Sequence, residues 1–423
     1  MNHQKYDLPA VLGGTAAVTL DHSVTNTWPD LDQTDENAVV QIIRDGNIST
    51  HQVIRELEKD YASFTGRSYA LAHNNGTSAL LAAFQSIGLM PGDEVLVPSA
   101  TFWASVLPML WIGAVPVFCE SEPERMGIDP VDLERKITPK SRAIVVVHLW
   151  GLPSKMTEIF KIAKKYDLKI IEDASHAHGA SWRGRPCGSL GDVSVFSLQG
   201  DKLAPAGEGG ILLCDNYDYY EKAVCLGDIT RIIELQTPAR RFAATSFGIK
   251  TRIAPLSAAI GRNQLKHLKE HNELRNKNIT YLSSKLEKLG FDTFLPPSHV
   301  QRVYFEFLIR YAEKKCTVLP IEKLVGALNR EGCRVGAPRY PLLHKQPFFT
   351  EGAFKDILRL PSGADLPSYS DCFLPSTEAA NKTLLKLPSF PGPDNGILDQ
   401  YVHAFEKIMS YANEISKVTI END

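Results

Sequence analysis

Short apolar runs alternate with helical patterns between residues 69 and 200, and this alternation restricts the fold more than any other feature of the chain. The clearest run, A-I-V-V-V-H at 143–148, is of the kind that is buried on both faces of a sheet. Strands separated by helices of about ten residues predict a parallel or mostly parallel sheet with crossover helices, which is an α/β fold. The expected strands span residues 69–73, 94–98, 115–118, 143–148, 168–172 and 193–196.

Two of these runs lead to polar residues at the sheet edge where ligands of parallel sheets bind. One leads to Asp173, and the other leads to Ser197 and then to Lys202. A partly desolvated lysine is an amine nucleophile towards an aldehyde, and a carboxylate can hold a cationic ring nitrogen, which together are what a pyridoxal phosphate (PLP) enzyme requires. A solvated lysine and a turn-capping Asp are the common alternatives, but Ser197 and the run G-E-G-G at 207–210 favour an enclosed site. Glu172 is expected to face the other side, because strand side chains alternate.

The run N-N-G-T-S at 74–78 precedes a predicted helix and offers a place for a phosphate. Backbone N–H groups at Gly76 and Thr77, with a hydroxyl, match the anion sites of helix N-termini. The same run also fits an ordinary helix cap. The chain has neither a P-loop nor a G-x-G-x-x-G motif after a strand, which argues against ATP-binding and NAD-binding folds.

Aromatic and histidine residues flank these positions. Phe102 and Trp103 could wall a flat cofactor, although two aromatics that open a helix are more often part of a core. His176 and His178 could ligate a metal, but no third ligand with suitable spacing is present, so we expect no metal site. His176 is expected instead to hydrogen-bond near the phenolic oxygen of the cofactor.

Composition excludes several classes of protein. A formal charge of -3 over 423 residues gives no electrostatic case for nucleic acid or an anionic membrane as a partner. No apolar stretch is long enough to span a bilayer, and no signal peptide pattern opens the chain. The seven cysteines are scattered and never spaced as C-x-x-C, which indicates reduced thiols. We expect a soluble cytoplasmic protein.

The pattern divides the chain into three parts. Residues 1–35 are rich in turn formers and predict an extended N-terminal segment. Residues 36–260 contain the alternating strands and helices and predict the large domain. Residues 261–423 predict a smaller C-terminal α+β domain, with strands within 302–318 and a final helix at 399–416.

A series of motifs runs in order through most of the chain: V-L-G-G-T, N-N-G-T-S-A-L, P-G-D-E-V-L-V-P-S-A-T-F, I-I-E-D-A-S-H-A-H-G-A, F-S-L-Q-G-D-K and L-P-S-F-P. Together they resemble the DegT/StrS family of PLP-dependent sugar aminotransferases, fold-type I enzymes related to aspartate aminotransferase. The resemblance implies a large PLP-binding domain, with a mostly parallel mixed sheet between helices, and a smaller C-terminal α+β domain. It also implies a homodimer with shared active sites. The implied reaction moves an amino group from L-glutamate or L-glutamine to the ketone of a nucleotide-linked keto-sugar or a cyclitol, in amino-sugar, natural-product or polysaccharide biosynthesis.

The resemblance also implies roles for particular residues. Lys202 would hold PLP covalently and carry the proton, and Asp173 would pair with the pyridine nitrogen. The phosphate binders would be Gly76, Thr77 and Ser197, and Phe102 would stack on the ring, with Trp103 in that place if the register slips by one.

Some positions depart from the family pattern. His176 stands where the family commonly has Gln, and Lys250 stands where many members have an Asn that reaches the phosphate of the neighbouring subunit; Lys250 could equally face solvent. The loop 199–201 is closer to the cyclitol branch. The candidates for the acceptor pocket are Arg252, Arg339, Tyr340 and His344.

Two other functions are compatible with the same scaffold. One is a PLP-dependent dehydratase or lyase similar to the aminohydroxybenzoate synthases, and the other is a regulatory homologue without catalysis. Some relatives that are dehydratases replace the lysine with His, so the presence of Lys202 favours transamination.

Overall fold

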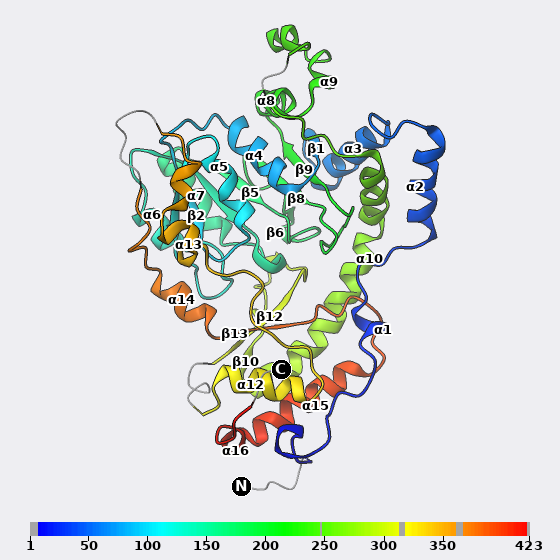
Figure 1. The fold of residues 1–423 in the computed structure, drawn as a ribbon, viewed down its shortest axis with the longest axis vertical. Coiled ribbons are helices and arrows are strands. Elements are labelled where there is room, and N and C mark those ends of the chain that lie inside the picture. The colour runs from blue at the N-terminus through cyan, green and yellow to red at the C-terminus, as the bar shows by residue number, and fades with distance from the viewer. Residues whose placement is uncertain (1–6, 246–247, 313–317, 361–366, 421–423) are drawn as a thin grey trace.

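The computed structural model describes residues 7–245, 248–312, 318–360 and 367–420, and it consists of a large sheet-based body joined to a smaller unit (Figure 1). A seven-stranded sheet forms the centre of the body, in the order β1-β9-β8-β5-β4-β2-β3. Parallel pairing joins β8, β5, β4, β2 and β3, whereas β9 is antiparallel to both neighbours. The predicted α/β class with a mostly parallel mixed sheet is confirmed. The strands are β1 Tyr69–His73, β2 Glu94–Pro98, β3 Val115–Cys119, β4 Ser141–Val147, β5 Lys169–Asp173, β8 Val193–Ser197 and β9 Gly210–Cys214.

The strand β9 lies outside the expected set. It follows G-E-G-G without an intervening helix, and all of its residues are buried. Because no crossover helix separates it from β8, the chain returns antiparallel beside that strand. The apolar residues I-L-L-C at 211–214 were the available signal, but a run this short does not distinguish a strand from a short helix by itself.

Helices α3, α4 and α8 pack against the end of the sheet that β1, β9 and β8 form. Helix α2 begins with a capping box, in which the Asp32 carboxylate accepts from the N–H of Asp35 and the Asp35 carboxylate accepts from the N–H of Asp32. The helices of the body are α2 Gln33–Asp45, α3 Val53–Thr65, α4 Gly76–Ser86, α5 Leu107–Leu110, α6 Pro130–Arg135, α7 Met156–Tyr166, α8 Tyr217–Gly227 and α9 Ile229–Ile232.

The helix predicted at 102–112 is wrong as a single element. The chain forms a 3₁₀ turn at Trp103–Ser105 and then the short helix α5. Val106, between them, has the non-helical backbone angles φ -124° and ψ -51°. Pro108 has no N–H to donate, so a continuous ladder of helical hydrogen bonds cannot pass through this point.

The long helix α10, Pro255–Leu286, joins the two parts of the molecule (Figure 1). Its Leu268 belongs to the hydrophobic core under the large sheet, whereas its Ile279 and Leu286 belong to a second core in the smaller unit. The predicted domain boundary at 260/261 therefore falls inside a helix, and the division into domains stays a prediction.

Three antiparallel strands, β10, β12 and β13, form the sheet of the smaller unit. Of the predicted strand region at 302–318, residues 307–311 form β12, and residues 313–317 lie outside the described residues. The predicted final helix is present as α15, followed by α16. The remaining elements are α1 Ser23–Asn26, β6 Ser181–Trp182, β7 Arg185–Pro186, β10 Phe291–Asp292, β11 Val300–Gln301, β12 Phe307–Tyr311, α12 Ile321–Arg330, α13 Pro347–Thr350, α14 Pro375–Asn381, β13 Leu384–Leu387, α15 Ile397–Ser410 and α16 Ala412–Ile415.

The N-terminal segment is tied to the smaller unit by the buried carboxylate of Glu331. Glu331 accepts from the backbone N–H groups of Ala10 (2.7 Å) and Ala17 (2.8 Å). It also forms an ion pair of 3.0 Å with Lys407, which is itself buried. Among the described helices, none combines the length and the hydrophobicity that a membrane span requires.

Replacing Glu331 with Ala should therefore release the N-terminal segment and destabilise the smaller unit. The variant would leave the Lys407 ammonium buried without its partner, which typically costs about 3–5 kcal/mol. Chemical denaturation measures the loss, and hydrogen exchange should show faster exchange at residues 10–18. Glu322→Ala, at an exposed position of α12, is the matched control. Unchanged exchange in the Glu331 variant would contradict this account.

Candidate active site

Lys202 lies in the turn that follows β8, and its side chain is enclosed. The residue is 8% exposed, and its Nζ lies 4.2 Å from the centroid of the Phe305 ring. Its backbone is held on both sides, because its N–H donates to the Gln199 carbonyl and its carbonyl accepts from the Trp28 indole N–H at 3.2 Å. Burial lowers the pKa of the Lys202 amine to about 8, a shift that the negative charge of Asp173 partly opposes. A substantial neutral fraction therefore exists near neutral pH.

Asp173 ends β5, the strand beside β8, and its register partner there is Val195. Its Oδ2 accepts from the Ser105 hydroxyl at 2.7 Å, and its Oδ1 accepts from the N–H of Ser175 at 3.1 Å. These bonds fix the carboxylate, and each oxygen keeps a lone pair for a further donor. The site therefore holds a carboxylate and an amine within each other's electrostatic reach.

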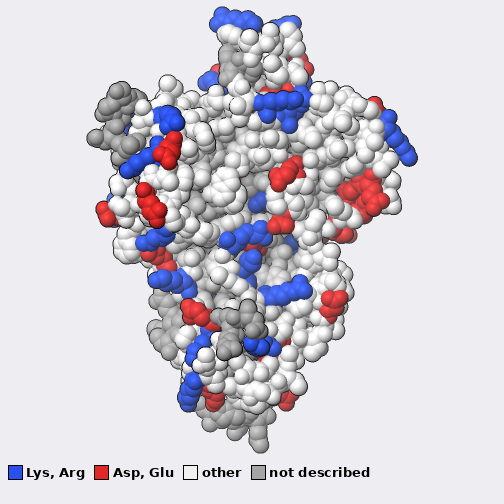
Figure 2. Space-filling view, in the orientation of Figure 1, with Lys and Arg blue, Asp and Glu red and all other residues white. Residues whose placement is uncertain are grey.

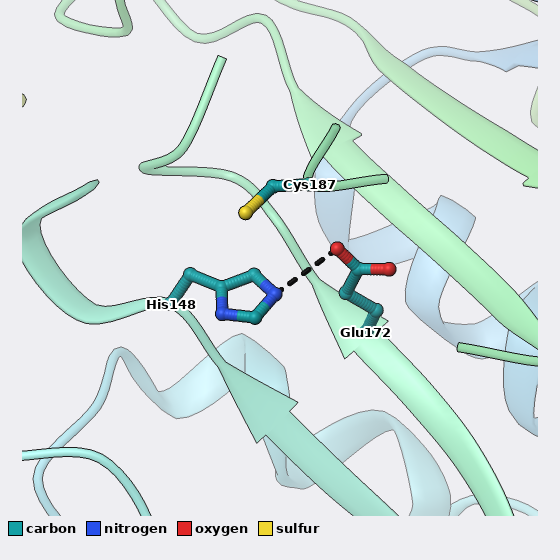
Figure 3. A group of neighbouring side chains, drawn as sticks. All are labelled: His148, Glu172 and Cys187. Carbon is teal, nitrogen blue, oxygen red and sulfur yellow. Dashed lines mark hydrogen bonds and ion pairs between the residues drawn. The ribbon is translucent and has the colours of Figure 1, made fainter. Parts of the chain in front are cut away.

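Glu172 points away from Asp173, as the alternation of strand side chains predicts. Figure 3 shows it beside His148 and Cys187, and the dashed line marks its 3.0 Å pair with the His148 Nε2. The carboxylate also accepts from several groups of one loop, among them the backbone N–H of Gly188 and the hydroxyl of Ser194. Burial opposes ionisation of Glu172, but the hydrogen bond from His148 and those of the loop outweigh it and lower its pKa to about 2.

The same three side chains lie close enough to hold a metal ion, but their ligand atoms are either engaged in hydrogen bonds or protonated. The Nδ1 of His148 accepts from the N–H of Ser154, so its Nε2 carries the proton that Glu172 accepts. Burial raises the pKa of the Cys187 thiol well above its ordinary value, which keeps it protonated. We interpret this cluster as a structural support beneath the site.

The predicted phosphate site lies where α4 begins. The Asn75 side chain caps the helix by accepting from the N–H of Ser78 at 2.8 Å, and the N–H groups of Gly76 and Thr77 open the helix. A Cβ on Gly76 would lie 2.9 Å from the Cβ of Ser197 and 3.2 Å from its hydroxyl, so only glycine allows this close approach. Backbone donors, a hydroxyl and the helix dipole therefore converge on one point.

Rings surround the space near Lys202. The His176 ring stacks on Phe305 at 4.3 Å and on Tyr340 at 5.6 Å, and its Nε2 pairs with the Tyr340 hydroxyl at 3.1 Å. Its Nδ1 accepts from the N–H of Trp150, so Nε2 is the protonated nitrogen. Burial, and then the charge of Lys202, lower the pKa of His176 well below its ordinary value, so the ring is neutral.

Phe102 lies beside these rings and is not part of a core. It is 40% exposed, and its ring centroid is 5.7 Å from that of Tyr340 and 4.9 Å from that of Trp103. An exposed aromatic pair at the carboxyl edge of the sheet can cover a flat ligand. The stacking role of Phe102 stays a prediction.

The predicted acceptor residues separate into two groups. Arg339 and Tyr340 lie at the site, since the Arg339 guanidinium is 5.4 Å from the Phe305 centroid and pairs with Asp201 at 3.0 Å. Arg252 and His344 have partners elsewhere.

Arg252 stands beside the end of β1, where it pairs with Asp228 at 3.6 Å and donates to the Ser49 hydroxyl at 3.0 Å. The buried His344 has both ring nitrogens engaged, Nδ1 by the Ser99 hydroxyl at 2.6 Å and Nε2 by Glu378 at 3.0 Å. Neither ring nitrogen of His344 is left for a substrate, so this geometry argues against the predicted contact of His344 with the acceptor.

Lys250 is exposed and lies outside the Lys202 cluster. It follows the segment that contains α9, which projects from the body in Figure 1, whereas α8 packs against α4 and β1. Four residues of the site escaped the sequence-based prediction, since they carry no local pattern of their own: Trp28, Ser105, Phe305 and Glu306.

The residues present fit PLP, although its placement is not part of the observed geometry. An amine can bond to the aldehyde, a carboxylate can accept from the ring nitrogen, and the N-terminus of α4 can bind the phosphate. The fit rests on three independent donor or acceptor sets at one edge of one sheet.

Comparison with known proteins supports this reading. The model of the DegT/DnrJ/EryC1/StrS aminotransferase family matches residues 29–396. The chain is 31% identical over 388 residues to a GDP-perosamine synthase of Caulobacter vibrioides, a match that covers 90% of this chain and 97% of the other. It is 30% identical over 383 residues to an L-glutamine:scyllo-inosose aminotransferase of Streptomyces griseus, which covers 86% of this chain and 87% of the other.

Solved structures give the same picture. An aminotransferase from Psychrobacter cryohalolentis matches with a TM-score of 0.79 and 27% identity, over 91% of this chain and 98% of the other. A 3-amino-5-hydroxybenzoic acid synthase matches with a TM-score of 0.76 and 27% identity, over 91% of this chain and 97% of the other.

The lowered pKa of Lys202 predicts unusual reactivity in protein that has been freed of PLP. With a pKa of about 8 instead of 10.5, about one amine in ten is neutral at pH 7, against about one in three thousand for an ordinary lysine. Trace labelling with acetic anhydride, read by mass spectrometry, should rise with pH at Lys202 and reach half its maximum near pH 8. The exposed Lys269 is the internal control. A shared midpoint for both lysines would contradict the prediction.

Proposed function

Because the chain belongs to the DegT/DnrJ/EryC1/StrS aminotransferase family, we propose that it moves an amino group from L-glutamate or L-glutamine to the ketone of a nucleotide-linked keto-sugar or a cyclitol. The enzyme is a PLP-dependent aminotransferase. The relatives named for GDP-perosamine and for scyllo-inosose support the two acceptor classes. The observation that carries the proposal is the buried Lys202 amine, with its lowered pKa, beside the fixed carboxylate of Asp173.

Lys202 is the proposed catalytic residue. When bound, PLP supplies an electron sink that stabilises negative charge at the reacting carbon. The Lys202 amine would hold the cofactor, and as a free amine it would carry the proton of the donor's α-carbon. Asp173, which Ser105 keeps in place, accepts from the protonated ring nitrogen.

The other residues of the site hold the cofactor in place. The N–H groups of Gly76 and Thr77 and the hydroxyl of Ser197 bind the phosphate in this proposal. Both nitrogens of His176 already have partners, so its ring supports the cofactor and orients the Tyr340 hydroxyl towards the phenolic oxygen. Phe102 covers the ring from its exposed side.

The proposed enzyme is a cytoplasmic homodimer in which Lys250 reaches the phosphate site of the neighbouring subunit. Two observations support the dimer: Lys250 is exposed, and the segment before it projects from the body of its own subunit. Among the described residues, Cys119, Cys187, Cys214, Cys333 and Cys372 are free thiols, which fits a reducing compartment.

The first test of the proposal is the donor half-reaction. Purified protein loaded with PLP should convert L-glutamate to 2-oxoglutarate, about one per site, without any acceptor, and a panel of keto-sugars and cyclitol ketones should then accept the amine. Lys202→Ala should lower the half-reaction rate by at least about a thousandfold, because it removes both the covalent link and the proton carrier. Lys269→Ala, at an exposed position, should leave it unchanged. A Lys202→Ala protein as fast as wild type would overturn the proposal.

The shared site has a separate test. Lys202→Ala and Lys250→Ala protein, each weak alone, should regain activity when mixed and allowed to exchange subunits. A mixed dimer carries one site with neither substitution, so about a quarter of all sites should be intact after random exchange. Sedimentation measures the dimer itself. Failure of the mixture to gain activity while the subunits exchange would show that Lys250 serves its own subunit or none.

A further inference from the structure

A cavity of about 600 Å³ is lined by residues of the N-terminal segment, by Asp201 of the large body and by residues of the smaller unit. Figure 2 shows basic side chains gathered on this face near the middle of the molecule. Three lining residues connect the cavity to the lysine: Asp201 precedes it, Phe305 contacts its Nζ, and Trp28 donates to its carbonyl. Part of the cavity wall is therefore formed by residues that contact Lys202 or precede it in the chain.

Glu306 lines this cavity with an unused carboxylate oxygen. Its Oε1 accepts from the Nε of Arg339 at 2.7 Å and lies 3.7 Å from the Nζ of Lys386. Its Oε2 has no hydrogen-bond donor among the described residues, although Glu306 is only 4% exposed. A buried acceptor without a donor is unfavourable, and more so when it is charged. A ligand that donates a hydrogen bond at this point would remove that cost.

Asn26 presents a second unused group to the same cavity. Within the described parts of the chain, neither the oxygen nor the nitrogen of its side-chain amide has a partner, and both atoms are buried. An amide offers both a donor and an acceptor, and so does a hydroxyl group. A carboxylate and an amide together therefore suit a ligand that carries more than one hydroxyl.

The amino donor does not match this pair. Its carboxylates would meet the negative charge of Glu306. Two of the three basic residues that line the cavity already face carboxylates, since Arg339 is shared between Glu306 and Asp201 and Lys386 lies 3.7 Å from Glu306. The amine of the donor must reach the cofactor that Lys202 holds. A polyhydroxylated ketone has neither conflict, because its hydroxyls donate and its carbonyl is free to face Lys202.

We propose that Glu306 and Asn26 recognise hydroxyl groups of the keto acceptor, with the Oε2 of Glu306 as the acceptor of a hydrogen bond from one of them. The inference rests on the proposed function and specifies it, since it assigns the selection of the acceptor to two residues. Arg339 is a positioning residue here. It holds Glu306 at the cavity wall through the Oε1 atom and leaves Oε2 for the ligand.

The test separates acceptor binding from the reaction with the donor. Glu306→Leu removes the carboxylate at similar volume, and Glu306→Gln keeps the shape but loses the charge. Two probes are titrated by calorimetry into the aminated enzyme, which cannot react with either of them. The first is scyllo-inositol, which has hydroxyls but no ketone, and the second is GDP-perosamine, which already carries its amine. The probe that wild-type protein binds should bind about 10- to 100-fold more weakly to Glu306→Leu, and the loss should be smaller in Glu306→Gln. This is the effect expected for a lost hydrogen bond to a charged group.

The donor half-reaction with L-glutamate supplies the second readout. The loss of rate should be smaller than the loss of probe binding in both Glu306 variants, because Glu306 adds to the negative charge near Lys202 but does not contact the donor in this account. Asn26→Ala should weaken binding of the same probe. Glu351→Gln, at an exposed position, should change neither probe binding nor the half-reaction rate.

Three outcomes would count against the inference: wild-type protein that binds neither probe, Glu306→Leu that binds the probe as tightly as wild type does, or Glu306→Leu that loses the donor half-reaction. Failure of the half-reaction in wild-type protein with both L-glutamate and L-glutamine would instead overturn the proposed function. The two failures are therefore distinguishable.

Discussion

The enclosure of one lysine is the constraint on which the rest of the structure depends. Burial lowers the pKa of Lys202 to about 8. An amine that is removed from water must be held in place by contacts with other parts of the chain. Support comes from Phe305 against its Nζ, from Trp28 at its carbonyl, and from Asp173 at the end of the adjacent strand. Each of these lies on a different segment, so the reactive amine exists only in the folded chain.

Two neighbouring carboxylates show how the sheet separates chemistry from support. Asp173 faces the site with bonds to Ser105 and Ser175 and keeps acceptor capacity for a ligand. Glu172 faces the opposite way, accepts from His148 and from the loop at 188–194, and has no comparable capacity left. The pleat of a single strand thus places a carboxylate that can still accept from a ligand beside a carboxylate that is fully used in the structure.

The smaller unit completes the site without containing the lysine. Helix α10 carries residues of both hydrophobic cores, which fixes one part of the molecule relative to the other. The cavity of about 600 Å³ draws Asn26 from the N-terminal segment, and Glu306 and Arg339 from the segments that flank β12 and follow α12. A pocket built from distant segments can change its preference for substrates while the cofactor site stays as it is.

The sequence by itself determined the α/β class, the mostly parallel sheet and the strand ends that carry Asp173, Ser197 and the turn to Lys202, because period and turn chemistry are local properties. It also identified Gly76, whose close approach to Ser197 explains the glycine. The tertiary structure decided the antiparallel return of β9, the break of the helix predicted at 102–112, and the engagement of His344 with Ser99 and Glu378. It alone brought Phe305 and Glu306 to Lys202, since contacts between residues a hundred positions apart follow from packing and leave no local pattern.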